Sequence, residues 1–423
     1  MCKIKIFGMG GLDENGKNTY VVNIDDHIFV LDAGLKYAND TIFGIDYILP
    51  DYSYLVQNKD KIVGVFITHA HPESYGGVND LIKVIPDIKV YATKYTYNQM
   101  ILEGIPANNL KLIETHKKIN INKELSVFPV RVNHSVPDSV MYVINSADGA
   151  IVYTGDFIID PTMMGPYNMD LGKIAYVGKQ GVLALLCESS FSENIGHTSP
   201  NHHMSSFFKN IINKASGRVI FSVLPVHLYT IEGIFNAAKN THRKIVIMGK
   251  KLQNIINMAI KDNYMDIDTN MIGDLSNIND SNAILLVCDD RANPYNSMEK
   301  IIAGNDKYIK LISTDTVCFA EPKYDENEKI FVKIENELAM MDINTINIPK
   351  DKGISLHASS EDLMLMINLL KPKYFVPVKG EYRYMVGNAD LASNLGYQKE
   401  NIILKQNGDV ALFVNGELKD VKE

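Results

Sequence analysis

Short apolar runs, many of them β-branched and each closed by a turn or a polar residue, fill the first third of the chain. This pattern is typical of β-strands. It predicts strands at residues 3–7, 19–24, 27–32, 61–67, 89–92, 125–131, 140–144 and 151–154. Helical spacing of apolar residues follows residues 68–77, and another helix is expected from about Thr93. Strands mixed with helices, with polar residues at the strand ends, predict an α/β layered domain whose site lies along one rim.

A different pattern begins near Gly196, where strand-like and helix-like segments alternate regularly. Strands are predicted at residues 218–223, 244–247, 283–287 and 308–312. Helices that alternate with these strands are predicted at residues 205–215, 231–238 and 252–261. Such alternation indicates parallel βαβ units and therefore a second α/β domain. Near Gly353 the earlier pattern returns, and a helix is expected over residues 360–370.

Composition narrows the class of protein. A chain of 423 residues predicts two to three compact units, and 46% hydrophobic with 22% charged residues is ordinary for a globular protein. No apolar run approaches the roughly 18–20 residues that span a bilayer, so we expect no membrane segment and no leader. The four cysteines lie far apart, which favours reduced thiols in a cytoplasmic protein. A net charge of −8 argues against coating nucleic acid by bulk charge but leaves a local basic channel open.

The candidate chemistry starts at Thr68-His69-Ala70-His71, a turn between a predicted strand and a predicted helix. Residues i and i+2 of an extended segment point to the same side, so His69 and His71 can converge on one ion. His134 and Asp156 lie in short loops after other strands. Three imidazoles and one carboxylate suit Zn²⁺ or Mn²⁺. The alternative is that each is an isolated polar residue in a turn, and the spacing alone leaves both interpretations open.

Several motifs together resemble the ribonuclease J family, collinearly over nearly the whole chain. They are Gly10-Gly11, Gly16-Lys17-Asn18, Asp32-Ala-Gly34, Thr68-His-Ala-His71 with Gly76-Gly77, Asn133-His-Ser-Val-Pro-Asp-Ser139, Tyr153-Thr-Gly-Asp156, His357-Ala-Ser-Ser-Glu-Asp-Leu363 and residues 370–383. The resemblance implies a metallo-β-lactamase αββα sandwich with an inserted β-CASP α/β domain. It places the first domain at 1–195 and 353–423 and the insertion at 196–352. From the resemblance we expect no counterpart of the family's additional C-terminal domain within these 423 residues.

The resemblance also implies metal ligands, because the family uses two ions. The first ion's ligands all match, as His69, His71, His134 and Asp156. The second ion shares the aspartate, and its other three positions here read Glu73, Ser74 and Lys379. We therefore expect at most one divalent ion, zinc or manganese, with the second site empty.

Lys379 has two interpretations. Its ammonium could lie near the vacated second site and supply positive charge to Asp156, to Glu73 or to a phosphate. The alternative is sequence drift, with the side chain extending to solvent along its apolar stem.

The substrate side departs from the family as well. His357, flanked by Ser355 and Ser359, matches the family's histidine that contacts the scissile phosphate, and Glu188 matches its first acidic β-CASP motif. His227 falls where the family holds the RNA 5′ phosphate. The loop at residues 288–294 carries two aspartates, which repel phosphate where small neutral groups would donate to it.

These comparisons leave more than one function open, and whether the chain is an enzyme stays undecided. The first hypothesis is an RNA-processing protein with weak or absent phosphodiesterase activity that acts with an active ribonuclease J homologue in a hetero-oligomer. The alternatives are an active one-metal exo- or endoribonuclease and a metallo-hydrolase of another substrate, such as a small ester. RNA is the expected partner, and a homodimer is also compatible with the family.

Overall fold

The structure is a computed structural model that describes residues 2–38, 44–288, 295–321, 328–349, 352 and 356–419. The chain divides into two compact units. The first comprises Met1–Ala38, Ile42–Ser199 and Leu356–Glu423, and the second comprises mainly Pro200–Ser355. The first unit therefore contains both ends of the sequence, and the second is inserted into it.

One sheet of the first unit has the strand order β22-β21-β1-β2-β3-β6-β7-β8. Its strands are β1 Lys3–Gly10, β2 Thr19–Ile24, β3 His27–Leu31, β6 Ile62–Phe66, β7 Val90–Ala92, β8 Leu110–Leu112, β21 Ala411–Val414 and β22 Glu417–Lys419. Strand β1 pairs with β2 on one side and with β21 on the other, both antiparallel. This sheet thus joins the first and last described strands of the chain.

The other sheet of the first unit has the strand order β20-β13-β12-β11-β10-β9. Its strands are β9 Ile119–Asn120, β10 Ser126–Arg131, β11 Val140–Ser146, β12 Gly149–Tyr153, β13 Val182–Glu188 and β20 Tyr374–Val378. Strands β12, β13 and β20 run parallel to one another. Their carboxyl ends therefore meet at one edge, which brings Asp156, Glu188 and Lys379 to the same rim.

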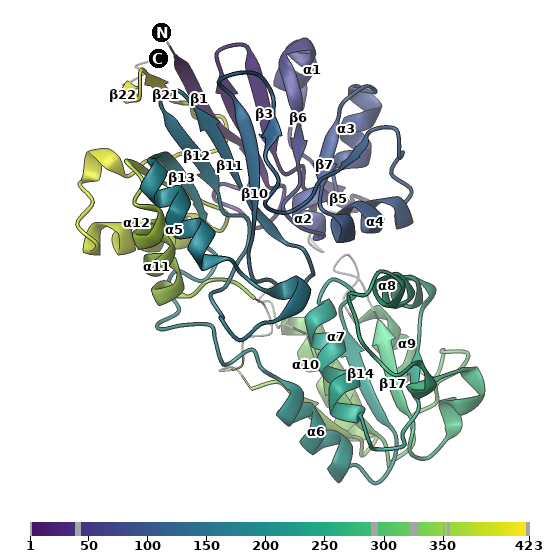
Figure 1. The fold of residues 1–423 in the computed structure, drawn as a ribbon. Coiled ribbons are helices and arrows are strands. Elements are labelled where there is room, and N and C mark those ends of the chain that lie inside the picture. Colours follow the sequence, from purple (N-terminus) through teal and green to yellow (C-terminus); the bar gives the residue numbers. More distant parts are fainter. Residues whose placement is uncertain are drawn as a thin grey trace. The chain divides into compact units, whose positions relative to one another are not determined.

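The two sheets bury a shared core, and helices cover their outer faces (Figure 1). Tyr20, Phe29 and Phe66 of one sheet belong to the same buried cluster as Tyr142 and Tyr153 of the other. Helices α5 Leu171–Gln180, α11 Ser360–Leu370 and α12 Tyr382–Asn394 pack on the second sheet, and α1 Ser53–Gln57, α3 Val78–Val84 and α4 Lys94–Leu102 flank the first. The predicted αββα sandwich is confirmed.

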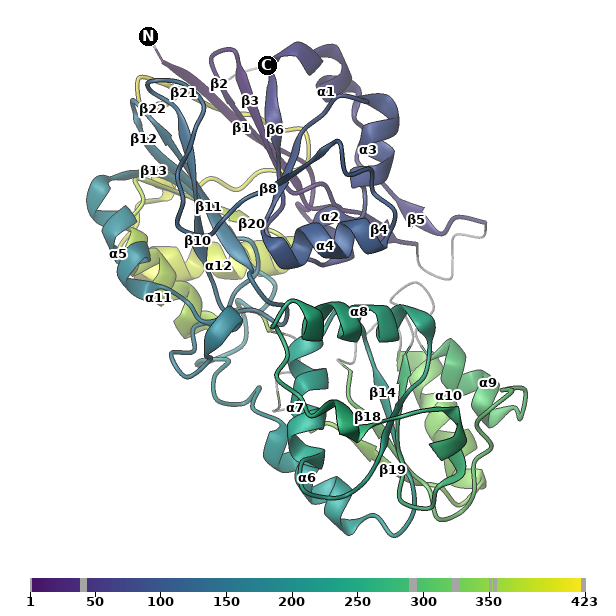
Figure 2. The same ribbon diagram turned by 45° about the vertical axis from the view of Figure 1, so that its right-hand side comes forward.

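The second unit is a parallel sheet surrounded by helices (Figure 2). Its described strands are β14 Val219–Val223, β15 Ile245–Ile247, β16 Ile272–Gly273, β17 Ile284–Cys288, β18 Thr316–Phe319 and β19 Asn344–Asn347, in the order β16-β15-β17-β14-β18-β19. The helices are α6 Ser205–Lys214, α7 Leu228–Ala238, α8 Lys250–Lys261, α9 Asn296–Ile302 and α10 Glu328–Met340. Every strand pair given for this sheet is parallel, as the alternating pattern predicted.

The strand predicted at residues 308–312 is wrong. The Asp306 carboxylate accepts the backbone N–H groups of Tyr308 and Ile309, at 2.8 and 2.7 Å, so these donors are used in a turn. Tyr308 and Ile312 are also exposed rather than packed. The strand of this region is β18, which pairs with β14.

Candidate metal centre

The turn that carries His69 and His71 follows strand β6 and ends at the short helix α2, Pro72–Tyr75. Two glycines after α2 let this turn pack closely against the end of β3. A Cβ atom on Gly76 would lie 2.6 Å from Leu35 Cδ2, and one on Gly77 would lie 2.5 Å from Tyr52 Oη. Gly77 N–H also donates to Ala33 O at 2.9 Å. The glycines thus fix the position of the histidine turn.

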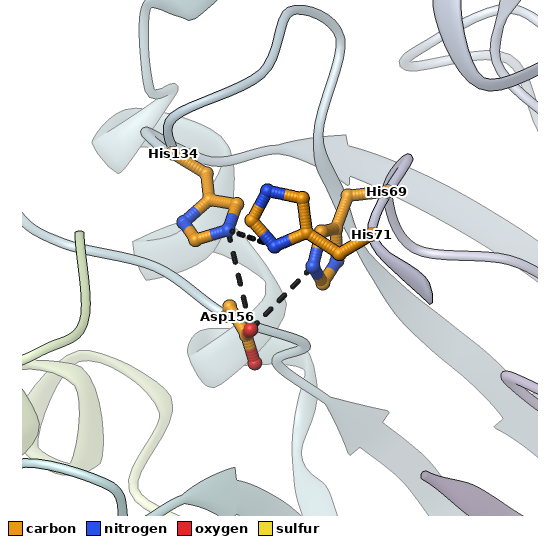
Figure 3. Close-up of side chains that lie close together, drawn as sticks. All are labelled: His69, His71, His134 and Asp156. Atoms are coloured by element: carbon orange, nitrogen blue, oxygen red, sulfur yellow. Dashed lines mark hydrogen bonds and ion pairs between the residues drawn. The ribbon is translucent and has the colours of Figure 1, made fainter. Parts of the chain in front are cut away.

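His69, His71, His134 and Asp156 converge at the rim of the sandwich (Figure 3). One ligand atom from each lies within 4.8 Å of all the others, and all four residues are buried. Asp156 Oδ2 lies 3.4 Å from His69 Nε2 and 4.0 Å from His134 Nε2. His134 Nε2 lies 3.4 Å from His71 Nδ1. The structure therefore brings together the four residues that the sequence nominated.

The Asp32 carboxylate orients His69 through a hydroxyl. Thr68 Oγ1 lies 3.0 and 2.9 Å from the two Asp32 oxygens and 2.8 Å from His69 Nδ1. Because the threonine proton goes to the carboxylate, Nδ1–H of His69 donates to Oγ1, and the Nε2 lone pair faces the cluster. Tyr153 Oη also donates to Asp32, at 2.8 Å. The pKa of Asp32 is raised to about 6, mainly by burial. The nearby His69 and the Thr68 backbone N–H act in the opposite direction but are outweighed.

The other two imidazoles are held in the same way by groups outside the cluster. His134 Nδ1 lies 2.8 Å from Leu356 O, a carbonyl that can only accept, so this nitrogen carries the proton. His71 Nε2 lies 3.0 Å from Ser135 Oγ, which leaves Nδ1 on the side of the cluster. Such contacts behind a ligand fix ring orientation and tautomer.

These residues fit a divalent cation. Burial, and then the neighbouring His69 and His71, hold the pKa of His134 well below its usual value, so the ring is neutral and its lone pair is available. His69 Nε2 and Asp156 Oδ1 are buried without a hydrogen-bond partner among the described residues. Leaving such atoms unsatisfied costs roughly 1–3 kcal/mol each. Three imidazole nitrogens and one carboxylate are a donor set that suits zinc or manganese.

Lys379 also lies against Asp156. Its Nζ forms an ion pair and hydrogen bond with Asp156 Oδ2, and its side chain is buried rather than extended into solvent. Burial acts to lower the pKa of Lys379, but the carboxylates of Asp156, Glu73 and Glu188 outweigh it and raise the value. For Asp156 burial acts to raise the pKa, and Lys379, His357 and His69 outweigh it, so the pKa lies well below its usual value. Both groups are therefore charged.

Glu73 and Ser74 complete the wall beside the histidine turn. Glu73 Oε1 lies 3.4 Å from His71 Nδ1, and its backbone carbonyl accepts Asn18 N–H at 3.0 Å. Ser74 Oγ is buried and has no hydrogen-bond partner among the described residues. This wall thus offers one carboxylate and one hydroxyl.

His357 and Glu188 form a second polar group next to Asp156. His357 Nδ1 lies 2.7 Å from Glu188 Oε2 and 3.9 Å from Asp156 Oδ2. Glu188 Oε1 accepts the backbone N–H groups of Phe157, at 2.7 Å, and Ala358, at 3.4 Å. These three side chains also have the spacing of a metal-binding group, but both Glu188 oxygens are already hydrogen-bonded. Glu188 here orients His357.

Three further nominated positions remain: Ser359, His227 and Ser355. Ser359 is the N-cap residue of α11, and its Oγ lies 2.9 Å from Thr198 Oγ1. His227 belongs to the second unit, where it is the N-cap residue of α7. Ser355 and residues 289–294, which include the two loop aspartates, lie outside the described residues.

Three hydroxyl residues of the site were missed in the sequence. Thr68 and Ser135 each stand directly beside a nominated histidine, so adjacency was the available signal. Thr198 Oγ1 donates to His357 O at 2.6 Å across a long sequence separation. No local pattern marks it.

Comparison with known families gives three matches along the chain. Residues 12–181 match the metallo-beta-lactamase superfamily, residues 216–338 match the family described as "Ribonuclease J, beta-CASP domain", and residues 350–404 match the "Zn-dependent metallo-hydrolase RNA specificity domain". The three matches occur in the order that the sequence motifs imply.

Individual proteins agree with this. The chain is 32% identical to "Ribonuclease J 2" of Staphylococcus saprophyticus over 98% of this chain and 76% of that protein. It is 32% identical to "Ribonuclease J 2" of Staphylococcus aureus over 96% of this chain and 74% of that one. A solved protein of unknown function from Enterococcus faecalis V583 matches with a TM-score of 0.65 and 15% identity, covering 97% of this chain and all of that one, which supports the fold alone. The chain therefore belongs to the ribonuclease J family, with a metallo-β-lactamase domain and a β-CASP domain.

Proposed function

We propose that this chain is an RNA-processing protein that holds one divalent ion and hydrolyses RNA weakly or not at all. It acts with an active homologue in the cytoplasm, where unpaired cysteines are stable. The observation that carries the proposal is the asymmetry around Asp156. Asp156 is grouped with three imidazoles and also forms an ion pair with the ammonium of Lys379. The imidazoles and Asp156 supply a complete set of donors for one ion, whereas the ammonium is no metal donor.

RNA as the partner is supported by membership of the family and by the match at residues 350–404 to an RNA specificity domain. When bound, a divalent ion at His69, His71, His134 and Asp156 would polarise a phosphoryl oxygen and activate water. A symmetric clamp on both reacting oxygens needs two ions, so one ion gives slower phosphodiester hydrolysis.

The remaining residues position this chemistry. Glu188 fixes His357 Nδ1 at 2.7 Å, so the imidazole is held beside Asp156 in one orientation, ready to contact a phosphate. The Asp32–Thr68 pair does the same for His69. These supports keep the site pre-organised even where turnover is weak.

The test is an exonuclease assay on 5′-monophosphorylated RNA with added Mn²⁺ or Zn²⁺, alongside His69→Ala. We expect turnover within about tenfold of that variant, since one-ion hydrolysis lacks most of the metal contribution. RNA binding, measured with the same RNA, should persist. Robust turnover that His69→Ala abolishes would instead establish an active one-metal ribonuclease.

Two further measurements bear on the role. The triple change Glu73→Asp, Ser74→His and Lys379→His restores the family's pattern, and it should raise turnover if the second site is limiting. Co-purification with a full-length homologue from the source cell tests the partnership. A chain that neither binds RNA nor associates with a homologue contradicts the proposal.

A further inference from the structure

Three buried carboxylates crowd the rim of the first unit. Asp156 and Glu188 are each 1% exposed, and Glu73 is 8% exposed. Charges buried in this way are stable only when cations or hydrogen-bond donors compensate them. Glu188 is compensated by His357 and by backbone N–H groups. Asp156 needs a compensating cation of its own.

With metal bound, the three imidazoles His69, His71 and His134 do not supply that charge, because a ring that offers its lone pair to a metal is neutral. Among the described residues, the ion pair that Asp156 makes with a permanently charged side chain is the one with Lys379. Asp156 Oδ2 thus lies near two kinds of group, the imidazoles at 3.4 and 4.0 Å and the ammonium of Lys379. The same carboxylate therefore belongs to the candidate metal ligands and to an ion pair with a fixed cation.

The backbone holds Lys379 in this place. Lys379 directly follows β20, which pairs with β13. Its backbone φ of +56° lies in the left-handed region, which residues other than glycine seldom adopt. Its N–H donates to Gly11 O at 2.9 Å, and its carbonyl accepts Ser189 N–H at 3.1 Å. A strained residue that neighbouring segments hold on both sides is a common sign of a functional position.

We propose that Lys379 is a built-in cation that occupies the position of a second divalent ion at Asp156. The inference rests on the proposed one-ion function and names the group that limits the ion count. A fixed ammonium repels a divalent cation placed beside it in a poorly solvated site, and it compensates Asp156 whether or not metal is bound. The site therefore takes one exchangeable ion and keeps one permanent charge.

The first experiment counts ions. Full-length protein is stripped with chelator, reloaded with Zn²⁺, separated from free metal and analysed for zinc per chain. The unsubstituted protein should hold one ion, and His69→Ala should hold none. Ser74→His adds a donor but keeps the ammonium, so it should still hold one. Ser74→His with Lys379→His removes the ammonium and should hold two.

Each count has a meaning. Two ions in the unsubstituted protein or in Ser74→His would overturn the inference, since Lys379 would not exclude the second ion. One ion in the double variant would overturn it as well. No ion in the unsubstituted protein would contradict the proposed function itself, so the two failures are distinguishable.

A second experiment needs no bound metal. Lys379→Met and Lys379→Arg are compared by thermal unfolding in chelator, with circular dichroism to check folding. Lys379→Met loses the charge and should have a lower melting temperature than the unsubstituted protein. Lys379→Arg keeps the charge and should retain most of the stability. Asp156→Asn should remove the difference between lysine and methionine, because no carboxylate is left to compensate. Lys379→Met could instead lower the melting temperature equally in the Asp156 and the Asp156→Asn backgrounds, or Lys379→Met and Lys379→Arg could lower it equally. Either result would mean that Lys379 acts only by packing.

Discussion

Glu188 Oε2 lies 2.7 Å from His357 Nδ1, although 169 positions of sequence separate the two residues. Glu188 ends β13, and His357 lies just before α11. The contact is buried, and hydrogen bonds to charged groups contribute about 1.5–3 kcal/mol.

This pair predicts a measurable coupling. Glu188→Gln, His357→Gln and the double variant should give a coupling free energy of about 1–3 kcal/mol in urea unfolding. Glutamine keeps an oxygen that can accept Phe157 N–H, so the backbone contact is conserved in the cycle. Additive effects of the two substitutions would show that the pair contributes nothing as a pair.

Asp32 predicts a pH dependence in metal-free protein. Burial raises its pKa to about 6, so the folded state binds a proton more tightly than the unfolded state does. The contribution of Asp32 to stability is therefore complete below the usual carboxyl pKa and is lost as pH rises through 6. A shift of about two units corresponds to about 3 kcal/mol. The difference in unfolding free energy between the unsubstituted protein and Asp32→Asn should fall by this amount from pH 4 to pH 7.

Because the two proteins differ at one titrating group, subtracting them removes the titration of groups that do not interact with Asp32. A difference that stays constant or grows with pH would contradict the role of Asp32 burial.

Metal removal should destabilise the protein because His69, His71, His134 and Asp156 lose their bound ion. A ligand present at about 100 times its dissociation constant adds about 2.7 kcal/mol to a folded state. Chelator should therefore lower the melting temperature of the unsubstituted protein and of His116→Ala, whose histidine lies outside the cluster. It should leave His69→Ala unchanged. Equal sensitivity of the two variants would place the metal elsewhere.

Gly77 should not tolerate a side chain. A Cβ there would lie 2.5 Å from Tyr52 Oη and 3.0 Å from Gly34 O, so Gly77→Ala should cost about 1–3 kcal/mol and weaken zinc binding by moving the histidine turn. Gly172→Ala is the matched control, since that glycine lies in α5, where the nearest atom to its Cβ would be at 3.4 Å. Alanine there should stabilise the helix by up to about 1 kcal/mol.

The periodicity of apolar residues correctly predicted strands and helices that bury one face in the core. The strand over residues 19–24 and the helix over residues 360–370 have the predicted bounds, as β2 and α11. The apolar run at 308–312 misled because Tyr308 and Ile312 are exposed and a carboxylate takes the backbone donors. Side-chain competition of this kind is not visible in hydrophobicity.

The residues of the site likewise fall into those that a local sequence pattern predicts and those that depend on tertiary structure. His69 and His71 could be nominated because their spacing and strand-end position are local. The placement of Lys379 depends on β20 pairing with β13 and on a left-handed residue after the strand, which no local pattern specifies. Ser359 was nominated for substrate from the resemblance, and its position as the N-cap of α11 depends on where that helix begins.

The insertion of the second unit gives the first an order of assembly during synthesis. His69, His71, His134 and Asp156 are all translated before the inserted unit, whereas Lys379 follows Asp156 by 223 residues. Strand β20 can take its place beside β13 only after the whole inserted unit has been translated. A nascent chain therefore presents the histidine cluster first and receives its ammonium last, so the arrival of β20 is the step that completes the rim.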